Sequence, residues 1–330
     1  MYESRQLPRA STAIWARCTG GEIGPLLLAG VASLGLNFPA EALVFDVTYD
    51  ASVASAPAGF VPAFNDAINF YQTTFTDPIS ITINVGWGVI GTSGIPVAPQ
   101  DVADSSASTA LPPFTYSQVR NALIADSTSP DDAIAVASLP AVDPTGGGSF
   151  QMSTAEAKAL GLPPGGTPLD GSVGFNSSLS YTFDPAGRAV SSEFDFIGVA
   201  EHEISEVMGR FAQLRTGVFD PLDLFRYSAP GTRALTPGNN QYFSIDGGVT
   251  NINTFNGTGG GDLGDWAGLT ADSYNAFVGT GVELPVSAGD IREMDVIGYD
   301  LAAIPEPGSL ALLSGALLGV GFFRRNCAKA

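Results

Sequence analysis

Residues 198–210, GVAEHEISEVMGR, contain the only histidine of this 330-residue chain. Glu203 follows His202 directly, and Glu206 comes four positions after the histidine. Because residues four apart lie on the same face of an α-helix, His202 and Glu206 could hold one metal ion together. Apolar residues recur at helical spacing through this stretch, at Ile197, Ala200, Ile204, Val207 and Phe211. The spacing predicts an amphipathic helix that runs to about Leu214.

The residues before this helix indicate where it begins. Ser191 or Ser192 can cap it, and Glu193 and Asp195 would then lie in its first turn, where the helix dipole favours negative charge. Gly209 stands where the longer pattern HExxHxxGxxH has the glycine at which the chain turns. We therefore expect His202 to lie on an amphipathic helix that has one buried face.

Two interpretations of the motif differ in function. In the pattern HExxH, two histidines bind zinc, and the glutamate beside the first histidine is the general base. Here the pattern is HExxE, and a carboxylate oxygen is also an accepted zinc ligand, so His202 and Glu206 would bind zinc and Glu203 would be the base. In the alternative, Glu206 and Arg210 form a stabilising pair on an exposed helix, and His202 is a core histidine with its hydrogen bonds satisfied.

A third ligand must come from elsewhere, and residues 218–227, VFDPLDLFRY, offer one. If the segment from Pro221 is extended, Asp223 and Tyr227 lie on one face of a strand. Asp223 is then the predicted third ligand, and Tyr227 or Arg226 the group that stabilises the oxyanion. In the alternative, Asp220 and Pro221 start a turn that Asp223 caps.

The glycine-rich stretch GTGGGDLGDWAGLTADS contains Asp262, Asp265 and Asp272. Carboxylates in such a loop could hold Ca²⁺, although their spacing is not that of an EF-hand. The alternative is a solvated surface loop.

Elsewhere, the pattern of residues 43–303 predicts one α+β domain with long loops. Alternating apolar and polar residues predict strands near 43–50, 79–88 and 173–184, and helical spacing predicts helices at 64–75, 116–125 and 290–301. Residues 89–113, rich in Ser, Pro, Ala and Asp, are expected to form a surface excursion. We find neither an internal repeat nor a linker that would divide the domain.

Both ends of the chain have the pattern of processing signals. Arginines, an apolar run from Ile23 to Leu36 and small residues near Ala42 predict a secretory signal peptide over residues 1–42. At the other end, residues 304–330 contain a Pro-Glu-Pro triplet at 305–307, a short apolar run that could span a membrane, and the basic pair Arg324 and Arg325. This end resembles the PEP-CTERM sorting signal of Gram-negative bacteria, which implies processing by an exosortase-type enzyme and an exported, surface or matrix location.

Composition limits the possible partners. The formal net charge is −19, and residues 43–303 keep 8 basic and 29 acidic residues, so nucleic acid is excluded as a partner. Both cysteines, Cys18 and Cys327, lie in the predicted processed ends, which excludes a cysteine protease. Membrane contact is expected only through the terminal segments.

The motif HEISEVMGR and the closing MDVIGYD (residues 294–300) resemble metzincin-like zinc metalloproteases, the zincins. The resemblance implies a twisted sheet with a motif helix, a zinc cofactor and a peptide or protein substrate. The chain departs from the family pattern at Glu206, which replaces a histidine, and at Ala212, where the last histidine would stand. The predicted function is therefore a secreted zinc metalloendopeptidase; the alternative is a non-catalytic exported surface or matrix protein that retains a zincin scaffold.

Overall fold

The computed structural model describes residues 42–303, except 167, 215–216 and 269–270. The sorting segment 304–330 and all of the signal peptide but Ala42 lie outside the described residues. The α-helices are α1 Phe60–Thr74, α2 Tyr116–Asp126, α3 Pro130–Ser138, α4 Thr154–Ala159, α5 Phe196–Met208 and α6 Ala288–Val296. In the described chain, no helix has both the length and the apolar character needed to cross a bilayer. The fold is mixed α and β, which confirms the predicted class at that level.

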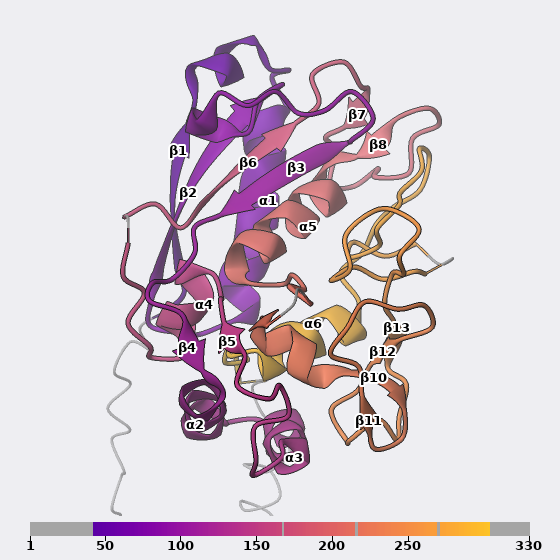
Figure 1. The fold of residues 1–330 in the computed structure, drawn as a ribbon. Helices are drawn as coiled ribbons and strands as arrows, with labels where there is room; N and C mark the ends of the chain where they lie inside the picture. The colour runs from indigo at the N-terminus through magenta and orange to yellow at the C-terminus, as the bar shows by residue number, and fades with distance from the viewer. Residues whose placement is uncertain (1–41, 167, 215–216, 269–270, 304–330) are drawn as a thin grey trace, which may run out of the picture. The chain divides into compact units, whose positions relative to one another are not determined.

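The main sheet has four strands: β1 Val44–Tyr49, β2 Ser80–Trp87, β3 Ala103–Ala107 and β6 Gly171–Phe175. Their order is β1-β2-β6-β3 (Figure 1). The first three strands in this order run parallel, whereas β3 pairs antiparallel with β6 and forms an edge. The strands predicted near 43–50 and 79–88 are confirmed. The prediction of a loop over 89–113 was wrong at β3, because the sequence ADSSA has no apolar alternation that would mark a strand.

Shorter strands form three further sheets. Strand β4 Phe114–Thr115 pairs with β5 Ser149–Phe150, which pairs with β9 Val218–Phe219. Strand β7 Tyr181–Thr182 pairs with β8 Phe194–Asp195. The fourth sheet has the order β11-β10-β12-β13, from Thr232–Arg233, Arg226–Ala229, Tyr242–Phe243 and Asn253–Thr254. These short pairings hold the long loops between the helices.

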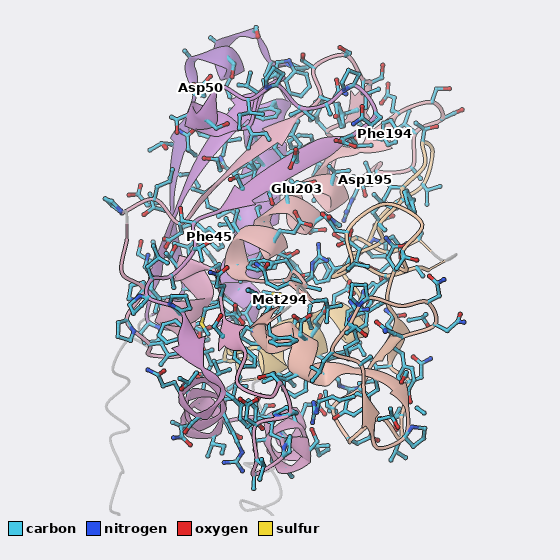
Figure 2. The ribbon with its side chains drawn as sticks, viewed as in Figure 1. Phe45, Asp50, Phe194, Asp195, Glu203 and Met294 are labelled. Carbon is cyan, nitrogen blue, oxygen red and sulfur yellow. The ribbon has the colours of Figure 1, made fainter. Side chains whose placement is uncertain are left out.

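Helices α1 and α5 pack together on the main sheet. The rings of Phe60 on α1 and Phe196 on α5 are 4.9 Å apart, and both contact Phe175 of β6. Gly171 of β6 allows the close approach of α5, because a Cβ there would lie 2.6 Å from the side chain of Val207. The core continues through Phe45 on β1 and Met294 on α6, both buried (Figure 2). The helix that carries His202 therefore lies on a rigid apolar support.

Both ends of α5 differ from the prediction. The helix starts at Phe196, one residue after β8, and the side chain of the N-cap residue Asp195 makes no capping bond. Asp195 instead pairs with Arg188 at 2.8 Å, so the prediction of a cap at Ser191 or Ser192 was wrong. The helix ends at Gly209, whose φ of 118° lies in the left-handed region that favours glycine. The predicted turn at Gly209 is confirmed, and the predicted continuation to Leu214 was wrong.

Carboxyl groups gather where α2, α3 and α6 meet. Asp126 ends α2, Asp132 lies on α3 and Asp295 on α6, and Asp77 accepts a hydrogen bond from the backbone of Asp300. Burial, followed by the charges of the neighbouring carboxylates, raises the pKa of Asp126 to about 8. Burial likewise raises the pKa of Asp295 to about 7. The folded protein therefore holds protons here that the unfolded chain releases above its ordinary carboxyl pKa.

This arrangement predicts that the free energy of unfolding falls as the pH rises from about 4 to 8, since the folded state binds more protons than the unfolded state in that window. Asp126→Asn removes one of these groups, and we expect it to raise the Tm at pH 8 by about 2–4 °C, as ~1 kcal/mol does in a domain of this size. The same substitution should have little effect at pH 4. Thermal unfolding at both pH values measures this. An equal Tm shift at pH 4 and pH 8 would contradict it.

Candidate metal centre

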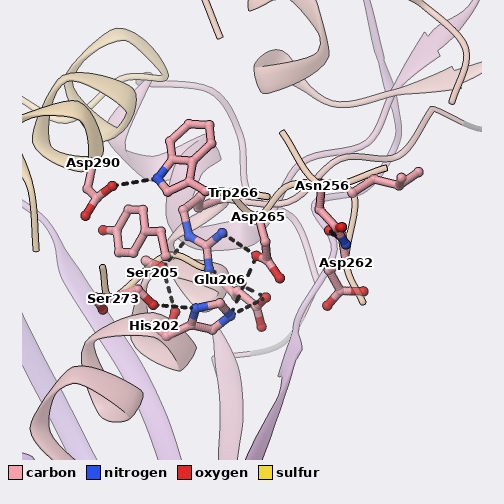
Figure 3. A network of polar contacts seen from close by, with 12 residues as sticks. His202, Ser205, Glu206, Asn256, Asp262, Asp265, Trp266, Ser273 and Asp290 are labelled. Carbon is pink, nitrogen blue, oxygen red and sulfur yellow. Dashed lines mark hydrogen bonds and ion pairs between the residues drawn. The ribbon is translucent and has the colours of Figure 1, made fainter. Parts of the chain in front are cut away.

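Three side chains from two distant parts of the chain converge at one point. His202 and Glu206 lie one turn apart on α5, and Asp265 comes from the glycine-rich loop (Figure 3). The Nε2 atom of His202 is 3.3 Å from Oε1 of Glu206 and 3.6 Å from Oδ1 of Asp265. One donor atom from each residue lies within 4.8 Å of those of the other two.

These distances fit the donor set of a zinc site. Zinc binds nitrogen and carboxylate oxygen at about 2.0–2.2 Å in a tetrahedron, whose ligand atoms are then about 3.4 Å apart. The two separations from His202, 3.3 and 3.6 Å, are close to that edge length. The residues present therefore fit a zinc ion with one nitrogen and two oxygen ligands, and a fourth position for water or substrate.

The orientation of the histidine leaves Nε2 available to an ion. Its Nδ1 lies 2.8 Å from the backbone carbonyl oxygen of Ser273, which can only accept, so Nδ1 carries a proton. The hydroxyl of Ser273 in turn donates to the carbonyl of Gly198 on α5 at 2.8 Å. A histidine ligand commonly has this second hydrogen bond, which fixes the ring and its tautomer.

Glu206 and Asp265 are each held by a further partner. The hydroxyl of Ser105 on β3 donates to Oε2 of Glu206 at 2.7 Å, so Oε1 faces His202. The fully buried guanidinium of Arg210 donates to Oδ1 of Asp265 at 2.6 Å and stacks on the ring of Tyr274. Gly264 permits this placement, because a Cβ there would lie 2.9 Å from the backbone of Phe211, next to Arg210.

The charges of this cluster shift its proton affinities. Burial and Arg210 act to lower the pKa of His202, but Asp265 and Glu206 outweigh them and raise it to about 10. Burial acts to raise the pKa of Glu206, but His202 and Arg210 lower it to about 2. Without a metal, His202 is therefore a cation between two carboxylates, and a metal ion would replace its proton.

A pocket of about 620 Å³ opens beside these residues. Glu203, His202 and Glu206 of α5 line one part of it, residues 100–104 with β3 line another, and the segments 261–265 and 273–278 complete it. Glu203 is only 6% exposed (Figure 2). Burial first, and the charge of Glu206 second, raise the pKa of Glu203 well above its ordinary value. The residue predicted as general base thus lies at the pocket beside the candidate ligands.

Asp223, the predicted third ligand, has another role. Residues Pro221–Phe225 form a 3-10 helix rather than a strand, and Asp223 accepts hydrogen bonds from the backbone N–H groups of Asp220 and Leu214, at 3.0 and 3.1 Å. It is fully buried in this capping box. The alternative interpretation, a turn that begins at Asp220 and Pro221, is the one observed. Asp265 occupies the place beside His202 that the sequence prediction gave to Asp223.

Tyr227 and Arg226 also lie away from the described lining of the pocket. The guanidinium of Arg226 stacks on Phe255 at 3.7 Å and donates to the backbone carbonyl of Leu263. The ring of Tyr227 lies under Arg233, 4.8 Å from its guanidinium. The extended conformation on which their predicted role rested is absent from residues 221–225, so neither reaches the site.

The three aspartates of the predicted calcium loop have separate places. Asp265 joins His202, and Asp262 lies exposed at the pocket. Asp272 accepts a hydrogen bond from the backbone N–H of Tyr274 at 2.8 Å. Calcium binding stays a prediction, because these three carboxylates have separate positions and do not form one common site.

Sequence reasoning missed Ser105, Ser273 and the true place of Arg210. Ser105 lies on the unpredicted strand β3, and Ser273 contributes a backbone oxygen, which no side-chain pattern indicates. The alternative interpretation of the motif paired Arg210 with Glu206 on an exposed helix, but Arg210 is fully buried and lies 3.7 Å from that residue. Asp265 could have been considered as a ligand from the sequence, because its loop contains three carboxylates and little positive charge.

Comparison with known proteins identifies one segment. The PEP-CTERM protein-sorting motif matches residues 303–325. No curated protein and no solved structure matches the chain. The motif indicates an exported protein sorted at the cell envelope and recognised by exosortase-type processing. The chain is thus similar to PEP-CTERM proteins in its sorting segment.

The geometry predicts that Asp265, and not Asp223, controls zinc uptake. Asp265→Asn keeps an oxygen that can accept from Arg210 but removes the anionic ligand, so we expect it to raise the Kd for Zn²⁺ at least about tenfold. Asp223→Asn should leave that Kd unchanged. Competition titration with a chromophoric chelator, with elemental analysis of the purified proteins, measures both. Equal weakening by the two substitutions would favour Asp223 as a ligand.

Proposed function

We propose that this protein is an exported zinc-dependent peptidase whose metal ligands are His202, Glu206 and Asp265. The single observation that carries the proposal is the convergence of one nitrogen and two carboxylate oxygens, within 4.8 Å of one another, at the lining of a pocket. When bound there, zinc would supply a Lewis acid that polarises a carbonyl group and lowers the pKa of water.

Glu203 has the position of the general base. It is next to His202 in sequence and, unlike Glu206, lines the pocket without belonging to the three-residue donor cluster. Its carboxylate would accept the proton of the attacking water and deliver it to the leaving amine. Burial keeps that carboxyl away from bulk solvent, which strengthens its interactions with the reacting groups.

Strand β3 gives a reason to choose a peptide as the substrate. It is an edge of the main sheet, and its residues Ala103 and Asp104 line the pocket. An extended peptide can pair with an exposed strand edge through main-chain hydrogen bonds. Such pairing would lay a peptide bond across the pocket, next to Glu203.

A second candidate, a non-catalytic envelope protein on a zincin-like scaffold, is favoured by one contact. Arg210 donates to the same Asp265 oxygen that faces His202, so two cations and two carboxylates already form a neutral buried network. Such a network can hold the loop against α5 without metal. The two candidates differ in whether zinc displaces the proton of His202.

Replacing Glu203 tests the proposed chemistry. Glu203→Gln keeps size and polarity but cannot accept the proton, so we expect kcat on a cleaved protein substrate to fall at least about 100-fold while zinc content stays the same. Glu283→Gln, the same change at a side chain that is 56% exposed and away from the pocket lining, is the control and should keep full activity. Undiminished cleavage by Glu203→Gln, or cleavage by zinc-free protein, would rule out this mechanism.

A further inference from the structure

The walls of the pocket are strongly acidic. Six carboxylates line it, from Asp101, Asp104, Glu203, Glu206, Asp262 and Asp265. Among the described residues that line it, none is Lys or Arg, and His202 is the one that can carry positive charge. The nearest buried cation, Arg210, lies behind Asp265 and pairs with it at 2.6 Å. The pocket therefore presents anionic groups to whatever enters it.

Three of these carboxylates lie outside the candidate metal centre and outside the motif helix. They belong to Asp101, Asp104 and Asp262, whereas the donor cluster consists of His202, Glu206 and Asp265. Arg210 pairs with Asp265 and Glu206 of that cluster, so it lies on the ligand side of the pocket.

These three carboxylates come from two different segments of the pocket lining. Asp104 lies on β3 and Asp101 just before it, and both are partly exposed. Asp262 is exposed on the loop that also carries Asp265 (Figure 3). Asp104 and Asp262 line the same pocket as Glu206 of the candidate metal centre. A ligand between β3 and the loop would have carboxylates on both sides.

An exposed aromatic ring adds the second feature. Phe277 lines the pocket, and 68% of it is exposed, so its ring is accessible to a ligand there. The glycine-rich loop passes close to this ring, because a Cβ on Gly261 would lie 3.1 Å from it. Val199 and Val278 lie on the same pocket. Aromatic and apolar surface beside carboxylates suits a long side chain with an aliphatic stem and a cationic head.

On the basis of the proposed peptidase function, we propose that the pocket selects peptide substrates by a Lys or Arg side chain. The aliphatic stem packs on Phe277 and Val278, and the cationic head lies between Asp104 and Asp262. A glutamate in the same place meets repulsion from both. The selected group is a side chain and not a free N-terminus, because the β3 edge receives an extended internal segment.

The test separates binding from cleavage. The probes are N-acetylated, amidated, alanine-rich hexapeptides with one Lys, Arg, norleucine or Glu at each position in turn. Calorimetric titration into the Glu203→Gln protein, with and without zinc, gives affinity without turnover. At the preferred position we expect Lys and Arg peptides to bind at least about tenfold more tightly than the norleucine peptide, and Glu peptides more weakly than either. Acetylation excludes recognition of the N-terminal amine.

Matched substitutions locate the selectivity. Asp104→Asn and Asp262→Asn should each reduce the preference for Lys over norleucine by about threefold or more, while affinity for the norleucine peptide is unchanged. Asp46→Asn, the same change at an exposed residue of β1 away from the pocket lining, should have no effect.

Each outcome decides a different question. Equal affinities for Lys, norleucine and Glu peptides, or no binding of any of them, would overturn the selectivity for basic side chains. If the wild-type protein still cleaves peptides in that case, the proposed peptidase function stands. Preferential binding of Lys and Arg peptides without any cleavage would support the selectivity and overturn the peptidase.

Discussion

The buried ion pair between Arg210 and Asp265 joins the two parts of the chain on which the candidate site depends. Arg210 follows the end of α5, and Asp265 belongs to a loop more than fifty residues later. The guanidinium is fully buried, so loss of its partner would leave a charge without compensation, at a cost of about 3–5 kcal/mol. Because Asp265 is fixed in this way, it lies 3.6 Å from His202, and the loop forms one wall of the pocket.

Much of the framework could be predicted from sequence, because period and composition act locally. Alternation at 43–50 and 79–88 and helical spacing around His202 correspond to β1, β2 and α5, and Gly209 ends α5 in the expected turn. Strand β3 could not be found, since its small and polar residues become a strand only by pairing with β6. In the site, His202, Glu203 and Glu206 follow from helix geometry alone. Asp265 depends on the fold of a glycine-rich loop, and Asp223 resembled a ligand only while residues 221–225 were taken as extended.

The same four charged groups support two accounts of the centre. As a neutral network, His202, Arg210, Glu206 and Asp265 hold the loop on α5. As a metal centre, His202 would lose its proton and the group would bind a divalent ion. Arg210 would then reduce the net negative charge around the ligands. The hydrogen bond from Nδ1 to Ser273 directs Nε2 towards the carboxylates and is compatible with both accounts. The sorting motif adds that the protein is exported and sorted at the cell envelope.

The most direct test is a crystal structure of the zinc-soaked protein, with anomalous diffraction measured on both sides of the zinc absorption edge. The account predicts one strong peak, about 2.0–2.2 Å from Nε2 of His202 and from carboxylate oxygens of Glu206 and Asp265. A structure without that peak, in which Nε2 of His202 still contacts Glu206 directly, would contradict the metal centre and leave the ion network as the purpose of these residues.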